Sequence, residues 1–84
     1  MKMKFKIGDR VRGKKELEYI GGKTGTIINI ITDENYEVIA VEFDEKIEYG
    51  HMCSVGNNEE IKERTAKAGH GWWCSYDELE KINE

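Results

Sequence analysis

Two histidines and two cysteines form the first set of side chains that could do chemistry. His51 and Cys53 are separated by one residue, His70 and Cys74 by three, and sixteen residues lie between the two pairs. Such donors suit tetrahedral zinc, which would help to stabilise a thin core, but this is not the spacing of a standard zinc motif. A disulfide between the cysteines is a second alternative, and two free thiols are the alternative that a reducing compartment favours. We therefore predict no metal and no cofactor.

An aromatic pair, Trp72-Trp73, follows His70 and Gly71. Adjacent residues of a strand point to opposite faces, so we expect one indole in the core and the other at the surface or in a groove. The exposed indole would be a platform for a base or a partner side chain, worth about 1–3 kcal/mol per stacked base. The alternative is a purely structural role, in which the second indole covers a neighbouring loop.

Hydrogen-bonding and cationic side chains complete the candidate site. His51, His70 and Tyr76 could hydrogen-bond to a ligand, and three cations from the basic first part of the chain could contact a phosphate. The candidate ligand-binding residues are Arg10, Arg12, Lys23, His51, His70, Trp72, Trp73 and Tyr76. The segment 21–25 lacks phosphate-loop spacing and leads into a strand, so we interpret it as a turn. No nucleophile has a recognisable base and orienting group, and we expect no enzyme.

Length and charge limit the function classes. The 84 residues suffice for a single domain over 1–84, and 38% hydrophobic residues supply only a thin core. The net charge is −4, with eight Lys/Arg against three Asp/Glu in residues 1–24 and five against fourteen in residues 25–84. This distribution argues against polynucleotide binding but permits a small anion near the basic end. We expect no membrane segment and a cytoplasmic location, because no apolar run is long enough.

Alternating apolar residues predict the strands of a small β domain. We expect strands over residues 1–7, 26–32 and 38–43, the last two forming a hairpin. A further strand begins at Trp72, and Ser75 to Glu78 has the S-x-x-E pattern of a capping box that starts one helical turn. The residues that we expect in the core are Ile7, Val11, Ile39, Val41, Phe43, Leu79 and Ile82.

Residues 54–69 interrupt this pattern. Asn58 to Ala68 predicts a short helix with an N-terminal cap, and Gly69 stands where a left-handed residue would end it. We interpret the segment as a loop excursion that a ligand could order. Many short strands with glycine turns favour a mostly β fold, a small SH3-like β-barrel with this inserted helix and a C-terminal helical turn. Mixed α+β is the alternative.

A family resemblance supports this fold. Residues 5–11, 22–27 and 41–44 resemble the opening of SH3-like and KOW-type barrels, and Gly50-His51-Met52-Cys53 with Gly69 to Cys74 resembles small phage and prophage proteins that join such a barrel to Gly-His and Gly-Trp-Trp elements. The resemblance implies an accessory phage protein in the cytoplasm of an infected or lysogenic bacterial host. Such proteins are often counter-defence factors that bind a host immune protein or sequester its nucleotide signal.

Two functions follow from these patterns. We expect a non-enzymatic protein that sequesters a small anionic nucleotide-type ligand in its aromatic and histidine-lined pocket. The alternative is a protein-interaction module that inhibits a host defence protein through an acidic face and an exposed tryptophan. A homo-oligomer is a further expectation, because small barrels gain stability from added burial.

Overall fold

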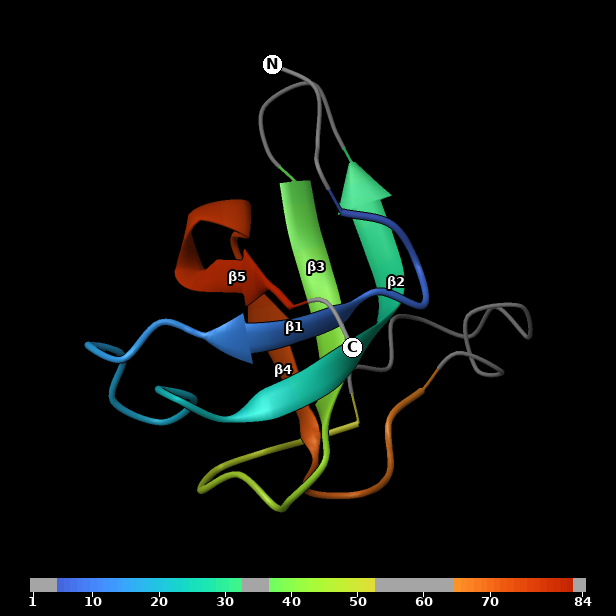
Figure 1. The fold of residues 1–84 in the computed structure, drawn as a ribbon. Helices are drawn as coiled ribbons and strands as arrows, with labels where there is room; N and C mark the ends of the chain where they lie inside the picture. The colour runs from blue at the N-terminus through green and yellow to red at the C-terminus, as the bar shows by residue number, and fades with distance from the viewer. Residues whose placement is uncertain (1–4, 33–36, 53–64, 83–84) are drawn as a thin grey trace.

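Five strands and one turn of 3-10 helix make up the fold of the computed structural model, which describes residues 5–32, 37–52 and 65–82. The elements are β1 (Arg10–Gly13), β2 (Thr24–Thr32), β3 (Glu37–Phe43), β4 (Gly71–Cys74), η1 (Tyr76–Glu78) and β5 (Leu79–Lys81). The strands form one antiparallel sheet in the order β4-β3-β2-β1-β5 (Figure 1). The prediction of a mostly β domain is confirmed. Among these strands β4 and β5 are the sheet edges and do not pair, so the sheet is not closed into a barrel.

β2 lies between two partners and bends along its length (Figure 1). β1 pairs only with its first residues, Thr24 to Thr26, whereas β3 pairs with it from Gly25 to Thr32, and β1 crosses β3 in the view of Figure 1. A bulge falls between Ile27 and Asn29, where Ile28 is the extra residue. Asn29 is buried, and its side-chain oxygen accepts the N–H of Ile30 at 3.0 Å. This side chain satisfies a backbone donor at the irregular position.

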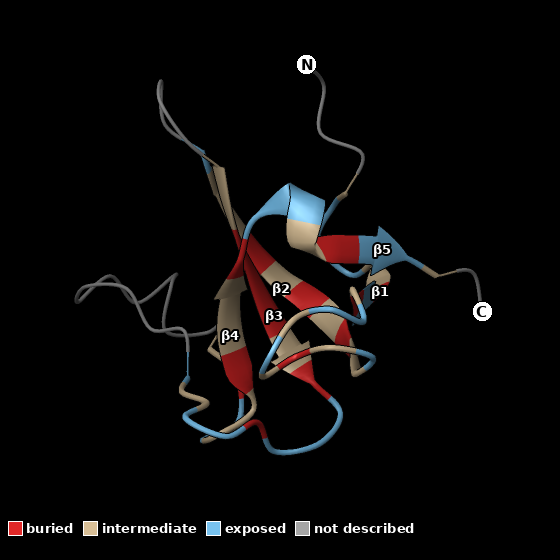
Figure 2. Cartoon of the chain, turned by 90° about the vertical axis from the view of Figure 1, so that its left-hand side faces the viewer, coloured by how far each residue is buried: buried red, intermediate tan, exposed pale blue. Residues whose placement is uncertain are grey.

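The core draws residues from all five strands. The alternating residues Ile39, Val41 and Phe43 of β3 are each at most 1% exposed, as the hairpin prediction required (Figure 2). Val11 and Leu79 are also buried and are confirmed as core residues. The remaining members of the buried cluster are Ile20, Ile27, Ile47 and Cys74. Gly25 lies opposite Phe43, and a Cβ there would meet the Glu42 carbonyl oxygen at 2.6 Å, so β2 and β3 pack closely at this point.

The predicted first strand is wrong over its described part. Residues 1–4 lie outside the described residues, and Phe5 to Ile7 form no strand. The Asp9 carboxylate accepts the Lys6 N–H at 3.0 Å, and the Lys6 carbonyl accepts the Asp9 N–H at 3.1 Å, which closes a turn. Ile7 therefore lies in this turn and is 49% exposed, so its prediction as a core residue is wrong. Ile82 is half-buried and is not a member of the buried cluster.

Most of the predicted helix, residues 58–64, lies outside the described residues, and residues 65–68 are not helical. Their backbone groups bond elsewhere: the Ala66 N–H donates to the Met52 carbonyl at 2.8 Å, and the Lys67 N–H donates to the Glu42 carboxylate at 2.9 Å. Gly69 has the expected left-handed backbone, with φ +83°, but it lies inside a turn that the His70 N–H closes on the Lys67 carbonyl, and not at the end of a helix.

At the C-terminal end, where a helical turn was expected, the structure has η1, a single turn of 3-10 helix. The Glu78 carboxylate accepts the Ser75 N–H at 2.8 Å, which is the glutamate half of the predicted capping box. No helix among residues 5–32, 37–52 and 65–82 is long and apolar enough to cross a membrane.

Candidate functional site

Four aromatic rings from three separate segments meet on one side of the domain. We call Tyr19, Tyr49, His51 and Trp72 the ring cluster. The Tyr19 ring is central: its centroid lies 5.5 Å from that of Tyr49, edge to face at 85°, and 5.5 Å from that of Trp72, tilted at 43°. The His51 ring stacks on Trp72 with a centroid distance of 5.9 Å. These are distances at which aromatic rings attract each other directly.

The ring cluster rests on β4 and the core beneath it. Trp72 is paired with Val41 of β3 and is half-buried against the core cluster. His51 is held beside it by two backbone bonds to Gly71, of 3.0 and 2.6 Å. The inner edge of the ring cluster is therefore fixed by the sheet.

Tyr49 forms the outer edge of the ring cluster and has an unusual backbone. It is 73% exposed, and its φ of 63° makes it the one left-handed residue other than glycine in the described part of the chain. The turn around it is closed by the Gly50 N–H, which donates to the carbonyl of buried Ile47 at 2.8 Å. A bulky side chain in this conformation is disfavoured by contacts of its Cβ. The fold thus keeps a large ring in solvent at a strained position.

His70 does not join the ring cluster. Its Nδ1 lies 2.8 Å from the carbonyl oxygen of Phe43, and because a carbonyl only accepts, Nδ1 carries the proton and donates. This bond fixes the imidazole against the end of β3. The structure therefore gives His70 a structural contact, while its neighbour in space, His51, belongs to the ring cluster.

The two tryptophans separate as strand alternation requires, but neither is fully buried or fully exposed. Trp72 faces the core side, whereas Trp73 is paired with Ala40, which is buried but is not part of the core cluster. Trp73 therefore lies on the opposite face of the sheet. Tyr76 lies on η1 and is 50% exposed. Of the predicted tryptophans and tyrosines, only Trp72 belongs to the ring cluster, where it meets the predicted His51.

The three predicted phosphate-binding cations each contact a carboxylate. Arg10 grips Asp44 with two nitrogens, at 2.9 and 2.6 Å, and also donates to Thr26. The Arg10 guanidinium, through these hydrogen bonds, lowers the pKa of Asp44 from 3.8 to about 2. Arg12 lies 3.5 Å from Glu80, and Lys23 lies 3.7 Å from Glu45. None of these cations contacts the ring cluster through a described interaction.

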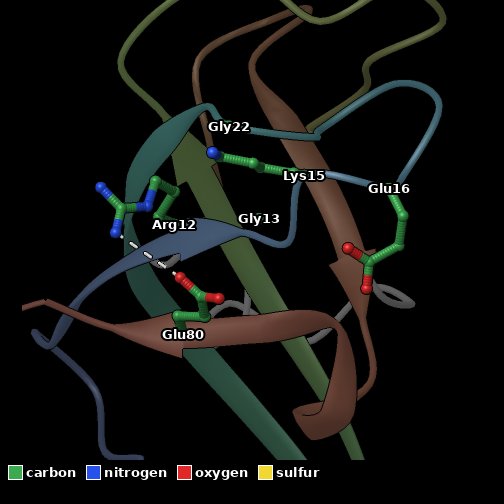
Figure 3. A pocket seen from close by; sticks show the side chains of 6 residues that line it. All are labelled: Arg12, Gly13, Lys15, Glu16, Gly22 and Glu80. Atoms are coloured by element: carbon green, nitrogen blue, oxygen red, sulfur yellow. Dashed lines mark ion pairs between the residues drawn. The ribbon is translucent and has the colours of Figure 1, made fainter.

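Arg12 lines an open hollow of about 540 Å³ between β1, β5 and the connection that precedes β2 (Figure 3). The other lining residues are Gly13, Lys15, Glu16, Gly22 and Glu80. Two cations and two carboxylates balance here, and the ion pair between Arg12 and Glu80 crosses the hollow in Figure 3. An entering phosphate would meet carboxylates as well as cations, so this hollow offers it no net attraction.

The histidine and cysteine set is only partly described. Cys74 is a buried free thiol in the core cluster, and Cys53 lies outside the described residues. In the described part of the chain, no group of three or more His, Cys, Asp or Glu side chains is placed to hold a metal ion.

Sequence reasoning missed Tyr19 and Tyr49, half of the ring cluster. A signal was present: each tyrosine follows a glutamate, in Glu18-Tyr19 and Glu48-Tyr49, within a polar connection where a large ring is otherwise unexpected. Only the fold shows that these two dipeptides meet. Comparisons of this chain with protein-family models, with curated proteins and with solved structures found no match in any of the three.

Proposed function

We propose that this protein is a non-enzymatic binding module that engages a partner protein through the ring cluster. The observation that carries the proposal is Tyr49, a residue that is 73% exposed on a left-handed backbone while its ring packs edge to face on Tyr19. An exposed tyrosine in a strained conformation adds nothing to the core, and strained residues concentrate at ligand-binding sites. Tyrosine and tryptophan are also the residues that contribute most to protein interfaces.

A protein partner fits the charges better than a nucleotide does. Arg10, Arg12 and Lys23 each face a carboxylate, so a phosphate would have to displace Asp44, Glu80 or Glu45 to reach them. Displacing Asp44, which Arg10 holds with two hydrogen bonds, would remove much of the gain from a new charged contact. Most of the remaining chain is acidic, which opposes an anion further.

Sequestration of a nucleotide is the second candidate function. A base could stack on the open face of Tyr49, a contact worth about 1–3 kcal/mol. The resemblance to small phage proteins implies a role in counter-defence in an infected host. Binding of a host protein and sequestration of a nucleotide signal would both serve that role. We further propose that the domain is SH3-like, a view supported by the bent β2–β3 hairpin and the single 3-10 turn that precedes the last strand.

A matched pair of tyrosine variants tests the proposal. Tyr49→Ala removes the exposed ring of the cluster, and Tyr76→Ala removes an exposed ring elsewhere. Immobilised wild-type protein and the Tyr76 variant should retain the same host protein from a bacterial lysate, and Tyr49→Ala should lose it. Calorimetry with the purified captured protein should then give a Kd at least tenfold higher for Tyr49→Ala. Equal binding by all three proteins would contradict the proposal.

The same variants also test the second candidate function, sequestration of a nucleotide. A panel of mononucleotides, dinucleotides and cyclic nucleotides should leave the melting temperature of the wild-type protein unchanged. A nucleotide that raises it in the wild type and not in Tyr49→Ala would replace the protein partner with a nucleotide ligand.

A further inference from the structure

Two Glu-Tyr dipeptides, far apart in the sequence, meet at the ring cluster. Glu18-Tyr19 lies in the connection before β2, and Glu48-Tyr49 lies in the loop after β3. The edge-to-face contact between the two tyrosines, with centroids 5.5 Å apart, joins them. The two glutamates are exposed at the same end of the domain, each one residue from a ring of the pair.

Glu18 and Glu48 differ from Asp44 and Glu45, the two other carboxylates of the loop that holds Glu48. Asp44 is gripped by Arg10, and Glu45 faces Lys23 at 3.7 Å. Within residues 5–32, 37–52 and 65–82, Glu18 and Glu48 have no ion pair or hydrogen-bond partner. Lys46, two residues before Glu48 in the loop after β3, lies against Gly69 with the carbons of its side chain. The ring cluster thus carries two carboxylates that are available to a ligand.

Rings and carboxylates select the same kind of ligand. The face of an aromatic ring is the negative part of its quadrupole and attracts a cation, and the attraction increases when the cation is partly shielded from water. The Tyr49 ring packs directly on Tyr19 and leaves most of its own surface open. Glu18 and Glu48 are exposed and each is next in sequence to a tyrosine of the pair, so their negative charge favours a cation at this surface and repels an anion.

We propose, on the basis of the proposed function, that the ring cluster recognises a cationic side chain of the partner protein, an arginine or a lysine in a basic segment. The cation lies on the Tyr49 ring and is neutralised by Glu18 and Glu48. Arginine is the stronger ligand, because its planar guanidinium stacks on a ring and offers several donors to carboxylates at the same time.

The test uses defined peptides with the full chain. The probes are acetyl-(Gly-Arg)4-amide, its lysine form and its citrulline form, in which an uncharged group of nearly the same shape replaces each guanidinium. Calorimetry should give saturable binding of the arginine peptide, weaker binding of the lysine peptide and at least tenfold weaker binding of the citrulline peptide. Raising the salt concentration should weaken the first two and leave the third unchanged.

Charge-matched variants locate the contact. Glu48→Gln and Asp77→Asn each remove one negative charge beside an exposed tyrosine, Tyr49 in the ring cluster and Tyr76 on η1. Glu48→Gln should weaken the arginine peptide at least threefold, and Asp77→Asn should not. Tyr49→Ala should weaken it at least tenfold, with Tyr76→Ala unchanged.

The outcomes separate this inference from the proposed function. If the citrulline peptide binds as well as the arginine peptide, or if Glu48→Gln and Asp77→Asn have equal effects, cation recognition is wrong. The loss of the captured host protein in Tyr49→Ala would still support a protein-binding ring cluster. If neither peptide binding nor host-protein capture depends on Tyr49, the proposed function is wrong as well.

Discussion

Replacing Tyr49 by glycine and by alanine measures how much strain the fold accepts in order to present this ring. Both substitutions remove the ring and its contact with Tyr19, so that contact cancels when the two variants are compared. Only alanine keeps a Cβ on a backbone whose φ is 63°. An L-residue pays about 1–2 kcal/mol in this conformation, and glycine loses about 0.4–1 kcal/mol through the greater freedom of its unfolded chain. Tyr49→Gly should therefore be more stable than Tyr49→Ala by about 1 kcal/mol.

Thermal unfolding followed by circular dichroism measures this difference. For a domain of this size, about 1 kcal/mol corresponds to a melting temperature roughly 4–8 °C higher for Tyr49→Gly. The control is the same pair of substitutions at Tyr76, which has no left-handed backbone, and there alanine should be the more stable residue. If alanine at position 49 is as stable as glycine, the backbone is not strained and the main support for the ring cluster as a binding site is lost.

Three further outcomes follow from the core, the sheet faces and the Asp44 ion pair. Val41→Asp should abolish cooperative unfolding measured by circular dichroism, because Val41 is fully buried and the new charge has no partner. Glu42→Gln keeps an acceptor for the Lys67 N–H and should unfold as the wild type does. Trp72→Ala should lower the free energy of unfolding in urea by about 3 kcal/mol, the lower end of the range for truncated aromatic residues. Trp73 lies on the face away from the core cluster, so Trp73→Ala should lower it less. Because Arg10 lowers the pKa of Asp44 to about 2, the stabilisation from this pair is present above about pH 4 and is lost as the pH falls towards 2. Asp44→Asn should remove that part of the dependence of stability on pH. Identical plots of stability against pH for the two proteins would contradict this.

The parts of the fold that could be predicted are those that a pattern of residues close together in the sequence determines. The β2–β3 hairpin follows from alternating β-branched residues, and the Ser75 to Glu78 turn follows from a capping pattern four residues long. Ile7 was misplaced because alternation alone cannot detect that the Asp9 side chain closes a turn around it. Residues 65–68 were misassigned because their backbone donors bond to Met52 and Glu42, which no local helix pattern can anticipate.

The candidate site was predicted less well because it depends on contacts between distant segments. His51 and Trp72 were identified by residue type and belong to the ring cluster. Arg10 was assigned to a ligand phosphate because its partner, Asp44, is 34 residues away in the sequence. Tyr19 and Tyr49 were missed because each lies alone in a polar connection, and only the packing of two loops brings their rings together.

Site-specific photo-crosslinking tests the central claim most directly. p-Benzoylphenylalanine at position 49 keeps an aromatic ring at the exposed edge of the ring cluster, and the same residue at position 76 is the matched control on η1. On irradiation in host cells, the protein labelled at position 49 should crosslink to one discrete partner protein, and the protein labelled at position 76 should not. Crosslinking at position 76 alone, equal crosslinking at both positions, or none at position 49 would contradict the assignment of the ring cluster as the binding surface.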